Sequence, residues 1–390
     1  MVWAGQTDPA RKSRCHDRFV PKISKGNLLS NALKSPSDKT ARNTSPGGAA
    51  PDDHPHVRLG KTGVLLINLG TPDATDYWSM RRYLKEFLSD RRVIDVNPAL
   101  WWLILNGIIL STRPQRSGAA YAKIWNKERD ESPFRTITRA QAEGLAGRMA
   151  QADEGQADIV VDWAMRYGTP SIPDRLRAMA DAGADRILFV PLYPQYSATS
   201  TATAMDKVFE TLLEMRWQPA VRTLPPFYDH PVHIDAVAGS IKRHLDSLSW
   251  TPEITLASFH GLPKRYLTEG DPYYCHAMKT GRLLREGLGL DEQQFQVVFQ
   301  SRFGKEEWLQ PYIEPLVEKL ARSGVKRLAV VMPGFVADCL ETLEEIGIGI
   351  GETFRENGGE EFTAIPCLNA SDEGLDMIEA LVREDLCGWI

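Results

Sequence analysis

Cysteine is scarce in this sequence, and the few cysteines are scattered. No two of them form a C-x-x-C pair, so neither a zinc knuckle nor a disulfide scaffold is expected. Such cysteine usage fits a reducing cytoplasm. The five cysteines are Cys15, Cys275, Cys339, Cys367 and Cys387.

Other class-defining signals are missing as well. There is no G-x-G-x-x-G after the first predicted strand and no Walker A sequence, so no nucleotide is expected to bind. The net charge of -5 implies no general affinity for nucleic acid. No apolar run reaches the roughly 18 residues of a membrane span. The run from Ala99 to Leu110 comes nearest, and its residues suit either a buried core helix or a lip that touches lipid or an apolar ligand.

Residues 1–58 differ in composition from the rest of the chain. Ser, Pro, Asn and basic residues dominate there without apolar periodicity, which predicts a disordered N-terminal tail. The tail lacks the apolar core of a secretory signal, and its scattered aspartates argue against an organellar transit peptide.

Beyond the tail, short apolar runs alternate with amphipathic stretches, which predicts an α/β fold with doubly wound, Rossmann-like parallel sheets. The predicted strands are 64–69, 159–164, 187–192, 254–258, 296–300, 328–332 and 362–365, and the predicted helices include 173–182, 232–248, 312–323 and 373–386.

The chain also repeats itself. Residues 66–70 align with 257–261, 166–170 with 302–306, and 183–191 with 324–333. This repeat predicts two similar α/β halves, 59–226 and 227–390, with the ligand between them, because strand ends in such sheets line the binding crevice. The last helix, 373–386, is expected to pack back on the first half.

His260 lies where the run 254–257 opens onto a glycine turn. Its counterpart in the first half is Leu69, so the fold itself does not require an imidazole here. Near the end of another predicted strand, a helix is expected to start at Asp338 and to carry Glu341 and Glu345 on one face. A neutral base and a carboxylate at neighbouring strand ends suit proton removal and handling of a divalent metal. The alternative for Glu341 is a capping box with Asp338 as N-cap.

Two further strand ends carry polar groups. Tyr196 and Ser197 belong to a segment rich in aromatic and hydroxyl side chains, which suits the wall of a pocket for a flat ligand; loop rigidity from its two prolines is the alternative. The segment 300–302 is followed by Trp308, and Arg113 and Arg116 offer partners for a carboxylate.

Together these segments resemble the ferrochelatase family over about residues 63–386. The motifs that carry the resemblance are Asn68-Leu69-Gly70-Thr71-Pro72, Trp163-Ala164-Met165-Arg166-Tyr167, Tyr193-Pro194-Gln195-Tyr196-Ser197, Ser258-Phe259-His260-Gly261-Leu262-Pro263, Gly270-Asp271-Pro272-Tyr273, Gln300-Ser301-Arg302-Phe303-Gly304 and Asp338-Cys339-Leu340-Glu341-Thr342-Leu343.

The resemblance implies a lyase that inserts Fe(II) into a free-base porphyrin, with protoporphyrin IX placed ahead of coproporphyrin, and releases two protons in the last step of haem synthesis. It implies that His260 and Glu341 are catalytic and metal-binding and that Glu345 lies on a proton or metal route. Arg166 and Tyr167 match residues near an outer metal path, and these two, with Tyr196, Ser197, Trp308 and Phe335, are the predicted substrate-binding residues.

The resemblance also bears on cofactors and location. Some relatives hold a [2Fe-2S] cluster through a cysteine just after the Tyr196-Ser197 motif and three more near the C-terminus; here Ala198 and only Cys387 occupy those regions, so no cluster and no prosthetic group are expected. The segment around Trp101 falls on the family's mouth lip. This favours a cytoplasmic protein with peripheral contact, through residues 99–110, to the inner face of the membrane.

Three alternatives remain open on the sequence. A chelatase for cobalt or another tetrapyrrole would use the same residue types, because His and carboxylate ligands do not strongly select iron over cobalt. A tetrapyrrole or metal carrier of the same fold would need the pocket but no proton acceptor. A nucleotide-dependent enzyme is disfavoured by the missing glycine fingerprint.

Overall fold

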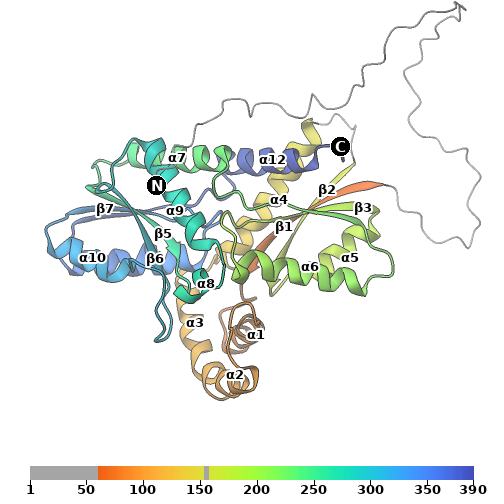
Figure 1. The fold of residues 1–390 in the computed structure, drawn as a ribbon, viewed down its shortest axis with the longest axis horizontal. Coiled ribbons are helices and arrows are strands. Elements are labelled where there is room, and N and C mark those ends of the chain that lie inside the picture. The colour runs from red at the N-terminus through yellow and green to blue at the C-terminus, as the bar shows by residue number, and fades with distance from the viewer. Residues whose placement is uncertain (1–59, 153–157) are drawn as a thin grey trace, which may run out of the picture. The chain divides into compact units, whose positions relative to one another are not determined.

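The computed structural model describes residues 60–152 and 158–390 (Figure 1). The tail predicted over residues 1–58 lies outside them. The strands are β1 (Lys61–Gly70), β2 (Ile159–Tyr167), β3 (Ala184–Pro191), β4 (Ala220–Thr223), β5 (Ile254–His260), β6 (Phe295–Gln300), β7 (Arg327–Val331) and β8 (Glu361–Ile365). The α-helices are α1 (Tyr77–Leu88), α2 (Pro98–Ile104), α3 (Leu110–Ile124), α4 (Pro133–Ala152), α5 (Ile172–Asp181), α6 (Thr203–Glu214), α7 (Pro231–Asp246), α8 (Lys264–Thr268), α9 (Tyr273–Leu288), α10 (Ile313–Arg322), α11 (Gly351–Glu356) and α12 (Asp372–Leu386). Three π-helices are η1 (Leu105–Ile109), η2 (Ala198–Ala202) and η3 (Glu341–Ile350).

The strands form two parallel four-stranded sheets with the same topology. Their orders are β2-β1-β3-β4 and β6-β5-β7-β8, so in each sheet the first strand along the chain is central and the third carries the fourth. The predicted fold class is confirmed, because the apolar strands are buried on both faces under helices. The proposed boundary at residue 226 falls between β4 and α7.

The register of the two sheets tests the internal repeat. Val190 of β3 pairs with Leu66 of β1, and Val331 of β7 pairs with Ala257 of β5. The sequence alignment matches these two pairs with each other, so this part of the repeat agrees with the structure. The alignment of the second strands is wrong by two residues: the structural equivalent of Arg166 is Gln300, not Arg302. A shift of two keeps the side chain on the same face of the sheet, so the hydrophobic pattern alone cannot detect it.

Helices cover both faces of the sheets, but the two faces are packed differently (Figure 1). On one face, α4, α7, α9 and α12 bury a continuous apolar core that runs under both sheets and includes Leu66, Phe259 and Met377. On the other face each sheet has its own core, one under α5 and α6 and one under α10, η3 and α11. The two sheets therefore share one hydrophobic layer, and α12 itself contacts α4, α7 and β3.

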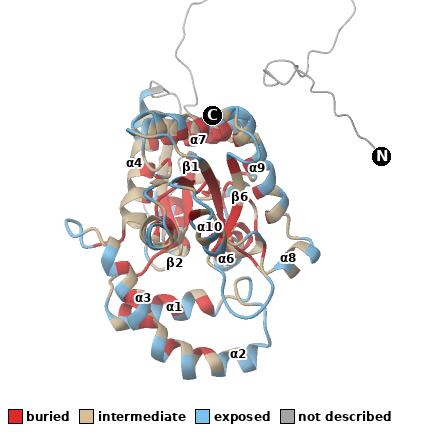
Figure 2. Cartoon of the chain, turned by 90° about the vertical axis from the view of Figure 1, so that its left-hand side faces the viewer, coloured by how far each residue is buried: buried red, intermediate tan, exposed pale blue. Residues whose placement is uncertain are grey.

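The helices α1, α2 and α3 extend away from the sheets, and exposed residues run along α2 (Figure 2). No residue of α2 is buried; Trp102 is 62% and Leu103 61% exposed. The core-helix alternative for this run is therefore wrong: Leu105 and Leu110 are buried in the small core beneath α1, and Trp101 and Ile109 pack against it only partly buried. No helix of the described residues has the length and apolarity that a membrane crossing requires.

Candidate functional site

His260 is the last residue of β5, and it lies opposite Gln300, the last residue of β6. The strand before it is buried, while the imidazole is half-buried at the strand end. Its Nδ1 lies 2.6 Å from the carbonyl oxygen of Gly261. Because a carbonyl can only accept, Nδ1 carries a proton in this contact, so in the neutral ring the lone pair lies on Nε2. In that tautomer Nε2 is the ring atom that can accept a proton.

The turn after His260 requires a glycine. A Cβ at Gly261 would lie 2.6 Å from the backbone oxygen of Gln300 and 3.2 Å from Cε3 of Trp308. The missing side chain therefore lets the indole of Trp308 pack directly against the turn. The indole Nε1 of Trp308 is buried and has no hydrogen-bond partner among the described residues, which leaves a donor free beside this strand end.

Glu341 begins the π-helix η3 and is half-buried. The capping-box alternative is wrong, because the Asp338 N–H donates to Asn369 Oδ1 at 2.8 Å. The Asp338 carboxylate instead accepts from Thr342 Oγ1 at 2.9 Å and from Asn369 Nδ2 at 2.6 Å. The helix therefore starts later than predicted, and the Glu341 side chain is not needed to cap it. Its π character fits a functional segment, where such turns are frequent.

Glu345 lies four residues further along η3 and is tied to the end of β6. Its Oε1 accepts the Ser301 N–H at 2.7 Å and its Oε2 accepts the Ser301 hydroxyl at 2.6 Å. These bonds hold Ser301 in the left-handed region, at φ 63°, which costs energy for a residue with a Cβ. Glu345 thus supports the backbone at the strand end opposite His260.

Electrostatics join these groups into one site. Burial raises the pKa of Glu345 and the Glu341 charge adds to that, while the Ser301 hydrogen bonds and His260 act in the opposite direction. Both His260 and Glu341 therefore lie close enough to act on the same carboxylate. Within residues 60–152 and 158–390, no three His, Cys, Asp or Glu side chains are grouped so that they could hold a metal ion.

Arg166 and Tyr167 end β2 and share a partner that the sequence did not reveal. Arg166 pairs with the Asp90 carboxylate and stacks over the Tyr167 ring, with its Cζ 4.3 Å from the ring centroid. The Tyr167 hydroxyl donates to Asp90 Oδ2 at 2.8 Å. Burial opposes ionisation of Asp90, but hydrogen bonds from Thr203, the Arg92 backbone and Tyr167, with the Arg166 charge, lower its pKa overall.

This cluster opens on a hollow of about 500 Å³ whose remaining wall mixes both charge signs. The hollow is lined by Asp90, Arg91, Arg92, Asp95, Arg166, Asp206 and Glu210. Asp90 follows α1 far from β2 in the sequence, and no local pattern marks it.

Tyr196 and Ser197 follow β3, as predicted, and are fixed by the start of α9. Asp271 Oδ2 accepts the Ser197 hydroxyl at 3.0 Å and the Ala198 N–H at 2.8 Å. The Tyr196 N–H donates to His276 Nδ1 at 3.2 Å. The sequence motif around Asp271 was visible, but neither its role nor that of His276 could be derived from it.

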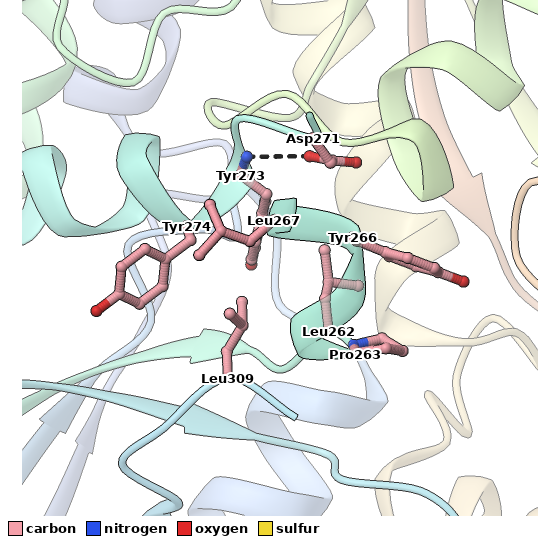
Figure 3. A pocket seen from close by; sticks show the side chains of 8 residues that line it. All are labelled: Leu262, Pro263, Tyr266, Leu267, Asp271, Tyr273, Tyr274 and Leu309. Atoms are coloured by element: carbon pink, nitrogen blue, oxygen red, sulfur yellow. Dashed lines mark hydrogen bonds between the residues drawn. The ribbon is translucent and has the colours of Figure 1, made fainter. Parts of the chain in front are cut away.

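Phe335 follows β7 and packs, partly buried, against the core under α10 and η3. A separate small hollow lies beneath the turn after His260 (Figure 3). Its lining consists of Leu262, Pro263, Tyr266, Leu267, Asp271, Tyr273, Tyr274 and Leu309. It leaves no room for even a water molecule, so it is too small for the flat ligand that the sequence predicts.

Comparison with known proteins matches the part of the chain that carries the motifs described above. The family model described as Ferrochelatase matches residues 61–386. The protein named Ferrochelatase from Rhizobium johnstonii is 60% identical over 340 residues, covering 87% of this chain and 98% of its own length. Its namesake from Agrobacterium fabrum is 58% identical over 342 residues, covering 88% and 98%. Among solved structures, SirB from Bacillus subtilis with Fe3+ is similar with a TM-score of 0.49 and 12% identity, covering 83% of this chain and 95% of SirB; that likeness is too distant to carry an argument.

Proposed function

This chain belongs to the ferrochelatase family, and we propose that it is a lyase that inserts Fe(II) into a free-base porphyrin and releases the two inner N–H protons. Protoporphyrin IX is the proposed ring, and the product is haem. The observation that carries the proposal is His260 at the end of β5, with a free Nε2 and with Glu341 and Glu345 in electrostatic reach.

The chemistry needs a proton acceptor and a bent ring. A planar free-base porphyrin hides its nitrogen lone pairs from an incoming ion, and bending it costs roughly 1–5 kcal/mol that ring burial must supply. His260 accepts a pyrrole proton at Nε2, which is worth about 10² to 10⁴ in rate for a well-placed base. Glu341, whose side chain takes no part in capping η3, is the proposed second acceptor and metal contact.

The remaining predicted residues have proposed roles around the ring. Tyr196, Ser197, Trp308 and Phe335 are proposed to form part of its binding surface. Arg166 and Tyr167, with Asp90, line the proposed outer route for iron, and Glu345 lies on the inner route.

Arg113 is proposed to meet a carboxylate at the edge of the ring. It stacks 5.0 Å from the Phe303 ring centroid, and burial, with the Arg116 charge, lowers its pKa. Among the described residues no acidic side chain pairs with it, so an anionic ligand group would relieve the repulsion between the two cations.

The chain is proposed to work without a prosthetic group, with iron only as substrate. The cysteine positions of cluster-containing relatives are occupied by Ala198 near η2 and by a single exposed Cys387 near the C-terminus. In the proposed reaction one Fe(II) ion replaces two N–H protons of the ring and no oxidation state changes, so neither a redox cofactor nor a nucleotide has a role in it.

The decisive experiment is anaerobic metal insertion by the His260→Ala variant. We expect porphyrin binding near that of the wild type and a loss of insertion rate of at least about 100-fold, because the proton acceptor is gone. His244→Ala is the matched control, since this half-buried imidazole on α7 lies away from the site, and its one ring hydrogen bond within residues 60–152 and 158–390 is to Thr363 Oγ1. Near-normal insertion by His260→Ala refutes the catalytic role.

Two alternatives are separated in the same assay. A carrier of this fold binds the porphyrin but leaves its free-base fluorescence intact when metal is added. A chelatase for cobalt or another tetrapyrrole inserts Co(II) faster than Fe(II), or prefers a ring other than protoporphyrin or coproporphyrin.

The protein is proposed to be cytoplasmic and to touch the inner face of the membrane through the exposed apolar side chains of α2 and η1. Leu100, Trp102, Leu103 and Ile108 expose apolar side chains that would be buried in the interface between headgroups and acyl chains. Trp102→Asp should therefore reduce co-sedimentation with anionic lipid vesicles. Leu213→Asp on α6, which removes a side chain that is 82% exposed, should leave it unchanged. Equal sedimentation of both variants contradicts the contact.

A further inference from the structure

The segment after β3 is held by α9 and the residues just before it, and these come from the other sheet's half of the chain. Gln195 Nε2 donates to Thr280 Oγ1 at 3.0 Å, and the Tyr196 N–H donates to His276 Nδ1 at 3.2 Å. Asp271 accepts from the hydroxyl and the backbone of the next two residues. The position of the Tyr196 side chain therefore depends on contacts that cross between the two halves.

His276 differs from the other members of this set because its hydrogen bond depends on its protonation state. A backbone N–H can only donate, so Nδ1 of His276 must be the unprotonated acceptor. The ring is held in this orientation by Tyr228, which stacks on it with a centroid distance of 3.6 Å and an interplanar angle of 8°. An imidazolium would carry a proton at Nδ1 and would oppose the Tyr196 N–H.

We propose that His276 is a positioning residue that holds the Tyr196 segment ready for the porphyrin, and that protonation of its imidazole releases this segment and weakens porphyrin binding. The inference rests on the proposed function, because it assigns a wall of the proposed porphyrin site. It adds a pH-sensitive element that does not contact the reacting atoms.

The charged groups around His276 come from three segments. Asp229 lies just before α7, Asp271 just before α9, and Lys279 lies one turn along α9, where its Nζ pairs with Asp229 at 2.6 Å. Burial lowers the pKa of His276, the two carboxylates act against this, and Lys279 acts with it, so the pKa lies below the ordinary 6.5. The imidazole is therefore neutral at pH 7 and becomes charged on acidification.

The test is the dissociation constant of protoporphyrin, measured by its fluorescence without metal, from pH 8 to pH 5. In wild type we expect it to rise about two- to tenfold more than in His276→Asn, the effect of one hydrogen bond. Asparagine keeps an acceptor close to Nδ1 but does not titrate. His276→Ala should bind porphyrin more weakly than His276→Asn already at pH 8, and the control His244→Asn should follow the wild-type profile.

A second measurement follows the Tyr196 amide directly and needs no porphyrin. After correction for the intrinsic pH dependence, hydrogen exchange at this amide should lose protection between pH 7 and pH 5 in wild type and stay protected in His276→Asn. Coinciding profiles for wild type and His276→Asn in both measurements overturn the positioning role. A wild type that binds porphyrin with the expected pH dependence but inserts no iron overturns the proposed function alone; one that binds no porphyrin overturns both.

Discussion

Asn369 is expected to be a stability determinant of the η3 segment, and its replacement tests how this segment is anchored. Its side chain donates to Asp338 Oδ2 at 2.6 Å and accepts the Asp338 N–H at 2.8 Å, while its carbonyl accepts from Gln141 of α4 at 3.0 Å. Its backbone is left-handed, at φ 53°. The residue thus links α4 to the start of the helix that carries Glu341.

The magnitude follows from two losses. Asn369→Ala removes both side-chain hydrogen bonds and leaves the N–H of the buried Asp338 without a partner, about 1–3 kcal/mol. Alanine also has a Cβ but no polar side chain that could form a local hydrogen bond, so the left-handed backbone costs about 1–2 kcal/mol in stability. The sum is a loss of about 2–5 kcal/mol in the free energy of unfolding. Asn369→Gly avoids the second loss but makes the unfolded chain more flexible, about 0.5–1 kcal/mol, so it should be the milder variant.

Thermal unfolding by circular dichroism measures the difference, at up to about 2–4 °C per kcal/mol for a long chain. Iron insertion at 25 °C should also slow in both variants, because Asp338 holds Thr342 next to Glu341. An Asn369→Ala variant that melts at the wild-type temperature, or an Asn369→Gly variant that melts below Asn369→Ala, refutes the reasoning.

Two further predictions concern the strand ends. Gly261→Ala should lower the melting temperature and weaken porphyrin binding, because the new Cβ lies 2.6 Å from the Gln300 backbone oxygen and must also displace Trp308; unchanged tryptophan fluorescence would contradict this. Glu345→Gln should gain stability relative to wild type as the pH rises from 4 to 7. Burial raises the Glu345 pKa in the fold, so the wild type loses its stabilising contribution as that carboxyl ionises. Equal melting differences at both pH values would argue against it, and the Ser301 bonds would then dominate.

Much of the fold was predictable because its signals are local. Of the eight strands in the described part of the chain, seven begin and end within a few residues of the predicted limits, and so do the four helices predicted over 173–182, 232–248, 312–323 and 373–386. The missed strand, β4, is a short edge strand whose residues are mostly exposed, so it carries no apolar run. The π character of η3 was not predictable either, since the 341–345 spacing suits an α-helix as well.

The chain's own residues determined the parallel α/β class, the repeat, and the placement of His260 at a strand end, because burial periodicity and turn chemistry are local properties of the sequence. The tertiary structure decided which distant groups meet them: Asp90 at Tyr167, Ser301 at Glu345, and His276 at Tyr196. It also decided that the run ending at Leu110 is largely exposed. Each of these depends on contacts between segments far apart in the chain, whose geometry no local pattern encodes.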